Sequence, residues 1–188
     1  MPGYFGALAI VLLLGMVLSR VWLLKQQGVT AVKFGRIDKT DFLIPPVMLF
    51  YFYLVFAAAF GWTSVGVRRL FASGLIAWLG VAACAAGLLL LLWSLISFKQ
   101  SFRIGIDTDR PDTLITSGAF AFSRNPIYVA FALVLIGEFL ILPNWVFLAY
   151  IVGFSLLVHR QVLREEDYLK AHYGQQCLDY SNRVRRYL

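Results

Sequence analysis

The chain has 188 residues, of which 60% are hydrophobic and 14% charged, and its mean hydropathy is +0.75. This composition excludes an ordinary soluble domain of this size. The net charge of +7 does not indicate nucleic-acid binding, because the basic residues are interrupted by acidic ones and lie beside apolar stretches.

Five long apolar stretches account for most of the chain: Tyr4–Leu24, Phe42–Trp62, Leu75–Phe98, Pro126–Leu142 and Trp145–His159. A helix needs about 20 apolar residues to cross a bilayer core of about 30 Å. None of the stretches alternates with a period of two, which favours helices over a membrane barrel. We therefore predict an all-α integral membrane protein with five transmembrane helices in a single domain, 1–188. The first stretch lacks a basic leader and a cleavage site, so we expect a retained helix.

The positive charges predict the orientation in the membrane. Of the 17 Lys and Arg residues, 15 lie at or beyond the ends of the first, third and fifth stretches. Only Arg68 and Arg69 lie on the other side. By the positive-inside rule, we predict that the C-terminus is cytoplasmic. The first three predicted helices occupy residues 1–98.

The second half of the chain is organised around a helical hairpin. The polar segment Lys99–Asn125 is long for a loop without structure of its own, which is typical of a functional loop. Leu142-Pro143-Asn144 joins the last two apolar stretches as a tight turn. Strong helix formers continue past the fifth stretch until Gly174, which predicts one helix over Trp145–Ala171, about 40 Å long. We expect this hairpin to extend into the cytoplasm.

Two polar clusters are predicted to lie at the same depth. Pro126 precedes Pro143 by 17 residues, and Glu165 follows Trp145 by 20 residues. At 1.5 Å per residue, both positions lie about 25–30 Å from the hairpin turn. Arg124-Asn125-Pro126 and the turn around Glu165 should therefore face each other at the cytoplasmic interface.

The residues in these clusters suit a zwitterionic ligand. Asn125 is a good N-cap and Pro126 a good first helical residue, so free amides and the helix dipole would attract an anion there. Arg124 adds a fixed positive charge. Glu165 offers a partner for an ammonium group or a ribose hydroxyl. No cysteine or histidine has metal-ligand spacing, so we predict no metal.

An ordered series of motifs carries a family resemblance: Leu114–Gly118, Ser123–Tyr128, Arg164–Leu169, Tyr173-Gly174 and Arg183–Arg186. These motifs resemble the pattern L-V-T-S-G-x-Y, R-H-P-x-Y, E-E-x-x-L, F-G-x-x-Y and R-V-P-R of the isoprenylcysteine carboxyl methyltransferase family. That family is related to the phospholipid N-methyltransferases. The resemblance covers residues 99–187.

The resemblance implies a membrane enzyme that uses S-adenosyl-L-methionine. Residues 99–188 would then form a cofactor-binding loop, the hairpin and a cytoplasmic tail. Arg124 and Glu165 are the expected catalytic residues. Carried over by position, the cofactor contacts fall on Thr113, Leu114, Ile115, Phe120, Arg124, Asn125, Pro126, Tyr128 and Glu165.

The chain departs from the family pattern at two functional positions. The histidine of R-H-P is Asn125, which can still cap a helix. One turn before Glu165, where prenylcysteine enzymes place an arginine for the substrate carboxylate, the chain has Gln161. Arg160 and Arg164 lie nearby on other faces. These three side chains are the candidate substrate-binding residues for a lipophilic or prenylated acceptor that enters from the membrane lipid.

Two alternatives remain open. One is an amino-lipid N-methyltransferase, whose acceptor must lose a proton although neither His159 nor His172 clearly faces the site. The other is a non-enzymatic small membrane transporter or scaffold. A transporter should carry ionisable residues at mid-membrane. Glu138 is the one candidate, but it lies about one turn from Pro143, which favours a snorkelling or packing role.

Overall fold

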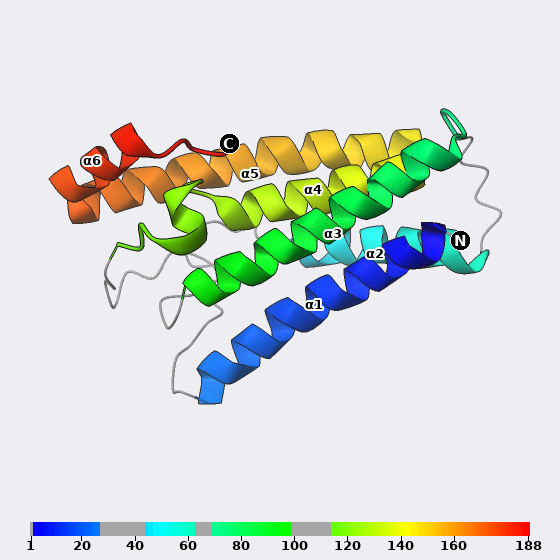
Figure 1. Ribbon diagram of the computed structural model, residues 1–188, viewed down its shortest axis with the longest axis horizontal. Helices are drawn as coiled ribbons and strands as arrows, with labels where there is room; N and C mark the ends of the chain where they lie inside the picture. The colour runs from blue at the N-terminus through cyan, green and yellow to red at the C-terminus, as the bar shows by residue number, and fades with distance from the viewer. Residues whose placement is uncertain (1, 27–43, 63–68, 99–113) are drawn as a thin grey trace.

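The computed structural model describes residues 2–26, 44–62, 69–98 and 114–188 (Figure 1). Every regular element in these ranges is helical, and none of them contains a strand. The elements are α1 (Pro2–Gln26), α2 (Ile44–Phe60), α3 (Gly74–Ser97), the 3-10 helix η3 (Gly118–Ala121), α4 (Pro126–Ile141), α5 (Trp145–Tyr173) and α6 (Gln175–Arg183). The prediction of an all-α protein is confirmed.

Three of these helices can cross a membrane by their length and composition: α1, α3 and α5. The other two apolar helices, α2 and α4, have 17 and 16 residues. At 1.5 Å per residue, 16 residues extend about 24 Å, which is less than a bilayer core of about 30 Å. The chain is therefore a membrane protein with several apolar helices, while the number of five crossings stays a prediction.

The helix ends in the second half lie where the sequence predicts them. Pro126 is the first residue of α4. The Oδ1 of Asn144 accepts the N–H groups of Val146 and Phe147 at 3.0 and 3.1 Å, so Asn144 caps α5. Helix α5 continues past the apolar stretch to Tyr173, and Gly174 follows with a φ of 52°. The predicted hairpin with a long second helix is confirmed.

Small residues bring α3 and α4 into the most extensive helix contact of the bundle. A Cβ added at Gly80 would lie 2.6 Å from the carbonyl oxygen of Gly137, and one at Gly87 would lie 2.8 Å from that of Ala130. Glycines at such positions allow two backbones to approach closely within a membrane. This contact fixes the position of α4, and with it the site at the start of α4.

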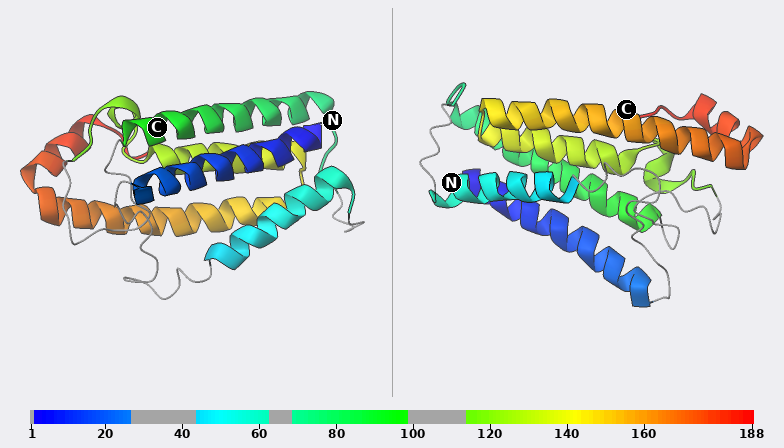
Figure 2. Two further views of the ribbon diagram at one scale, coloured as in Figure 1. Left: turned by 90° about the horizontal axis from the view of Figure 1, so that it is seen from below. Right: turned by 180° about the vertical axis from the view of Figure 1, so that it is seen from behind.

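The helices define two ends of an elongated bundle. The N-terminus and the α4–α5 turn lie at one end, here called the Pro143 end (Figure 1). The 3-10 helix η3 and α6 lie at the other, here called the α6 end. Helix α1 diverges from α4 and α5 toward the α6 end, as the view from behind also shows (Figure 2).

Glu138 of α4 lies inside the bundle near the Pro143 end. Its exposure is 0%, and neither carboxyl oxygen has a hydrogen-bond partner among the described residues. The carboxyl group packs against Gly6 of α1, where an added Cβ would overlap it. A snorkelling role for Glu138 is therefore wrong, and a packing role stays a prediction.

Candidate functional site

The 3-10 helix η3 carries the chain from α3 to the start of α4. Gly118 has a φ of 66°, a conformation that favours glycine, and the backbone N–H of Ala119 donates to the Oγ of Ser97 at 3.1 Å. At the other side of η3, the hydroxyl of Tyr180 donates to the carbonyl of Phe120 at 2.7 Å. Helices α3 and α6 therefore hold η3 from both sides and place the start of α4 at the α6 end.

The first turn of α4 is arranged differently from the prediction in one respect. Asn125 occupies the N-cap position and Pro126 follows as the first helical residue, as expected. The side chain of Asn125, however, makes no capping bond. Its Nδ2 donates instead to the carbonyl of Arg186 at 3.1 Å. Asn125 therefore ties down the C-terminal segment, and its side chain does not satisfy the first-turn amides of α4.

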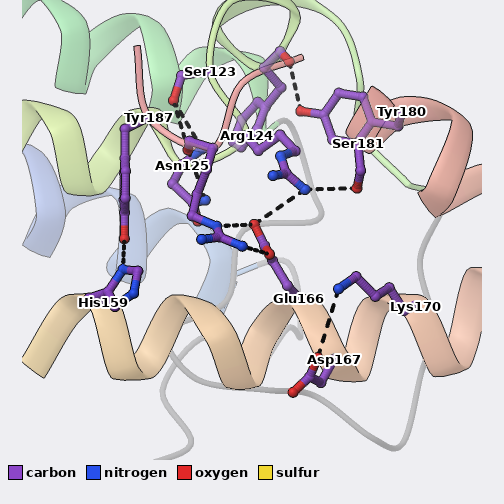
Figure 3. Close-up of polar contacts among 12 residues, drawn as sticks. Ser123, Arg124, Asn125, His159, Glu166, Asp167, Lys170, Tyr180, Ser181 and Tyr187 are labelled. Atoms are coloured by element: carbon purple, nitrogen blue, oxygen red, sulfur yellow. Dashed lines mark hydrogen bonds and ion pairs between the residues drawn. The ribbon is translucent and has the colours of Figure 1, made fainter. Parts of the chain in front are cut away.

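The C-terminal segment 184–188 runs back across the start of α4. The backbone N–H of Arg124 donates to the carbonyl of Arg185 at 2.9 Å. The hydroxyl of Tyr187 lies 3.0 Å from the Nδ1 of His159 on α5 (Figure 3). The segment thus contacts both helices that form the site.

Glu166 is the centre of the ionic contacts (Figure 3). Its side chain is only 8% exposed, and Arg186 holds it with Nε on Oε1 at 3.0 Å and Nη2 on Oε2 at 2.9 Å. The Nη1 of Arg124 lies 3.3 Å from the same Oε1 and donates to the Oγ of Ser181 at 2.7 Å. This carboxylate therefore joins α4, α5 and the C-terminal segment.

Glu166 and Arg186 each stabilise the charged form of the other. Glu166 lies in the polar part of α5 beyond His159, outside the apolar stretch. Burial alone would raise the pKa of Glu166, but the hydrogen bonds from Arg186 and the charge of Arg124 outweigh it and lower the pKa. The same hydrogen bond raises the pKa of Arg186. Burial raises the pKa of Tyr180, on α6, to about 12.

Glu165 makes a second, separate set of contacts. The hydroxyl of Tyr128 donates to its Oε1 at 2.8 Å, and the Nε2 of Gln161 donates to the same oxygen at 2.9 Å. Burial raises the pKa of Glu165, and the two hydrogen bonds partly oppose this rise. Both donors are neutral and both bind Oε1, which leaves Oε2 without a bond from any described side chain.

The two predicted polar clusters meet at the same level of the bundle, as expected. The residues that contact each other across them differ from those singled out. The start of α4 meets α5, but Arg124 contacts Glu166 and not Glu165. The first carboxylate of the Glu-Glu pair instead contacts Tyr128. The sequence predicted site roles for Arg124, Tyr128 and Glu165, but none for Glu166, Ser181 or Arg186. The second glutamate and the Arg-Val-x-Arg motif were the available signals for Glu166 and Arg186.

The remaining predicted residues lie around these contacts. Phe120 is buried, and its ring packs edge-on against Phe98 with the centroids 4.6 Å apart. Leu114 and Ile115 are half-buried immediately before η3, whereas Thr113 lies outside the described residues. Of the two arginines predicted near a substrate, Arg160 is exposed and Arg164 is half-buried on α5.

The arrangement offers both signs of charge in a confined space. The Nε of Arg124 is buried and has no hydrogen-bond partner among the described residues. Among the described residues, Tyr128 and Gln161 both donate to the Oε1 of Glu165, and neither binds Oε2. An anion beside Arg124 and a cation beside Glu165 would satisfy both groups. Within the described ranges, no group of three or more His, Cys, Asp or Glu residues could hold a metal ion.

Comparisons with known proteins place this geometry in a family context. The sequence profile of the phospholipid methyltransferase family matches residues 75–176, which include the start of α4 and both glutamates. The chain is also 28% identical over 136 residues to a protein-S-isoprenylcysteine O-methyltransferase from Tribolium castaneum. That alignment covers 68% of this chain and 48% of the relative, so the chain spans about half the length of the relative.

Proposed function

Because the chain belongs to the phospholipid methyltransferase family, we propose that it is an integral membrane methyltransferase. It uses S-adenosyl-L-methionine and acts on a lipophilic acceptor at the membrane interface, in the manner of an isoprenylcysteine carboxyl methyltransferase. One observation carries this proposal more than any other. Two motif segments that are far apart in the sequence meet through the contacts Tyr128–Glu165 at 2.8 Å and Arg124–Glu166 at 3.3 Å.

The residues at this meeting point fit the amino-acid part of the cofactor. The Nε of Arg124 has no hydrogen-bond partner among the described residues, and together with the first-turn amides of α4 it suits a carboxylate. The Oε2 of Glu165, which accepts no bond from a described side chain, suits an ammonium group or a ribose hydroxyl. An unsatisfied buried donor costs free energy, so a ligand that accepts a bond from the buried Nε of Arg124 is favoured.

When bound, S-adenosyl-L-methionine supplies a methyl group on a positively charged sulfur for direct displacement. The chain itself contributes alignment and exclusion of water, which can supply much of the rate enhancement of such a displacement. Glu165 orients the positive side of the cofactor, and Tyr128 and Gln161 hold that carboxylate in place. The C-terminal segment, fixed by Asn125 and Glu166, covers the start of α4 and limits access of water.

The proposed topology follows from the charge distribution. Five helices cross the membrane, and the α6 end with the C-terminus lies in the cytoplasm, because 15 of the 17 Lys and Arg residues lie, along the sequence, at or beyond the ends of the first, third and fifth apolar stretches. Helices α2 and α4 are short, and local thinning of the bilayer accommodates such lengths at modest cost. A reporter fused after Leu188 that is active only outside the cytoplasm would contradict this orientation.

The acceptor is proposed to be lipophilic, and it enters sideways from the bilayer. A lipid chain gains about 0.8 kcal/mol per CH₂ in hydrocarbon, so an enzyme within the membrane need not extract it. A carboxylate acceptor is already ionised at neutral pH and needs no base. Gln161, which replaces an arginine of the prenylcysteine enzymes, is neutral and donates to Glu165, so it cannot form an ion pair with a substrate carboxylate.

A second candidate acceptor is an amino-lipid, which the match to the phospholipid methyltransferase family favours. An amine must lose a proton before it attacks. The two histidines contact other aromatic side chains: His159 lies beside Tyr187, and the ring of His172 stacks on that of Tyr168. If water removes that proton, methylation of an amine should become faster as pH rises.

The experiment is transfer of a labelled methyl group from S-adenosyl-L-methionine to fractionated membrane lipids and to prenylated thiols. Label that mild base releases identifies a carboxyl methyl ester, and label that resists base identifies an N-methyl or S-methyl product. Transfer to either class supports the proposal. A folded protein that neither binds the cofactor nor transfers label to any fraction would contradict it.

A further inference from the structure

A cavity of about 470 Å³ lies at the Pro143 end of the bundle, away from the proposed methyl-transfer site. The first turns of α1 and α3, the last turns of α2 and α4, Arg69 and the residues from Phe71 to Ser73 line it. Its volume falls within the range of about 300–1,000 Å³ that is typical of ligand-binding pockets. The structure therefore has a second concave site that the proposed function does not use.

The cavity lies at the level of lipid headgroups. It lies at the start of α3, whose 24 residues extend about 36 Å, slightly more than a bilayer core. Exposed aromatic side chains surround this end of the bundle, namely Tyr4, Trp62, Trp78 and Trp145. Tyrosine and tryptophan concentrate at membrane–water interfaces. The cavity therefore opens where the headgroups of the leaflet opposite the methyl-transfer site lie.

Arg69 determines the charge of the cavity. Its other lining residues are uncharged, and most are apolar, such as Ala59, Phe71 and Ile141. Two helices begin and two end at this cavity, so their dipoles largely cancel. Arg69 is exposed and has no ion-pair partner in the part of the chain that the structure describes. Among the described residues, the cavity thus presents one positive charge, that of Arg69, above apolar walls.

We propose that this cavity binds an anionic phospholipid of the opposite leaflet. The phosphate contacts Arg69, and the glycerol and upper acyl chains lie against Phe71, Ala77 and Leu140. Basic pockets between transmembrane helices bind anionic headgroups in this way. A zwitterionic lipid is less suitable, because no acidic residue lines the cavity to pair with its ammonium group.

The test measures lipid retention by native mass spectrometry of the full-length protein, after exchange into mixed micelles with phosphatidylglycerol or phosphatidylcholine. The wild type should retain phosphatidylglycerol in preference to phosphatidylcholine. Arg69→Gln should reduce this retention by about fivefold, the effect of one basic residue at a membrane surface. Lys25→Gln removes an equally exposed positive charge at the other end of α1 and should leave retention unchanged.

A second pair of variants tests the cavity itself. Gly74 lines the cavity, and a Cβ added there meets nothing within 4 Å, so Gly74→Phe should fill the space without a clash and abolish retention. Gly153 on α5 is equally open but lies away from the cavity, so Gly153→Phe should behave as the wild type. Equal retention of both lipids by the wild type, or unchanged retention in Arg69→Gln and Gly74→Phe, would overturn the proposal.

Discussion

The hydroxyl of Tyr128 donates to the Oε1 of Glu165 at 2.8 Å, which joins the first turn of α4 to the polar end of α5. Resemblance alone would make Tyr128 a direct cofactor contact. The observed hydrogen bond indicates a positioning role instead: Tyr128 holds the carboxylate of Glu165, which we propose binds the cofactor. Because this donor is neutral, Glu165 keeps its negative charge for a cationic ligand.

Tyr128→Phe should weaken binding of S-adenosyl-L-methionine by about 0.5–1.5 kcal/mol, the usual net value of one hydrogen bond. The loss should disappear when Glu165 is already alanine, because Tyr128 acts through that carboxylate. Calorimetry on the double-mutant cycle measures this coupling. Equal losses from Tyr128→Phe in both backgrounds would show that the hydroxyl contacts the cofactor directly.

Glu166→Gln should release the C-terminal segment from the start of α4. The substitution removes the ionic contacts to Arg186 and Arg124, and hydrogen bonds to charged groups contribute about 1.5–3 kcal/mol. Hydrogen exchange of the amides in 184–188 should become faster. Asp167→Asn is the matched control, since Asp167 is exposed and its contact to Lys170 is 3.9 Å long. Faster exchange of these amides in Asp167→Asn, or unchanged exchange in Glu166→Gln, would contradict the role of Glu166 in holding the C-terminal segment.

Cofactor affinity should fall at low pH, and the fall should begin at a higher pH than an ordinary glutamate would cause. Burial raises the pKa of Glu165, so its carboxylate becomes protonated at a higher pH than an ordinary glutamate, whose pKa is about 4.3. Protonation removes the charge that attracts the ammonium group, so the affinity is lost as pH falls through the raised pKa. Titrations over this range should show the decline in the wild type and a flat profile in Glu165→Gln. A decline of the same size in both would assign the pH dependence to another group.

Glu138→Met should stabilise the protein by about 1–3 kcal/mol, because both carboxyl oxygens of Glu138 are buried without a described partner. Methionine has a similar length and adapts to irregular packing. Thermal denaturation in detergent measures the change, and the methyl-transfer rate should stay the same. Glu138→Gln keeps a polar group and should gain less. A lower stability of Glu138→Met would show that the carboxyl group has a partner of its own.

Local signals in the sequence specify the elements of the site well. Pro126, the Pro143-Asn144 turn and Gly174 mark helix ends, and fixed helical rise then predicts that the start of α4 meets the far end of α5. These signals depend only on residues close together in the chain, so they can be interpreted without a structure.

The pairing within the site depends on information that the sequence does not contain. Glu165 and Glu166 differ by about 100° around α5, so only the rotation of that helix decides which one meets Arg124. The return of the C-terminal segment is also a long-range event, because Arg186 contacts Glu166 across a separate helix, α6. The expected cap by Asn125 fails for the same reason: a carbonyl of that returning segment takes its side chain.

The central claim is that Arg124 and Glu165 hold S-adenosyl-L-methionine, and calorimetric titration of the cofactor tests it most directly. Arg124→Ala and Glu165→Ala should each weaken binding by about 1.5–3 kcal/mol, the value of hydrogen bonds to charged groups. Asp167→Ala, on the exposed face of the same helix, should bind as the wild type does. Unchanged affinity in both folded site variants would contradict the account.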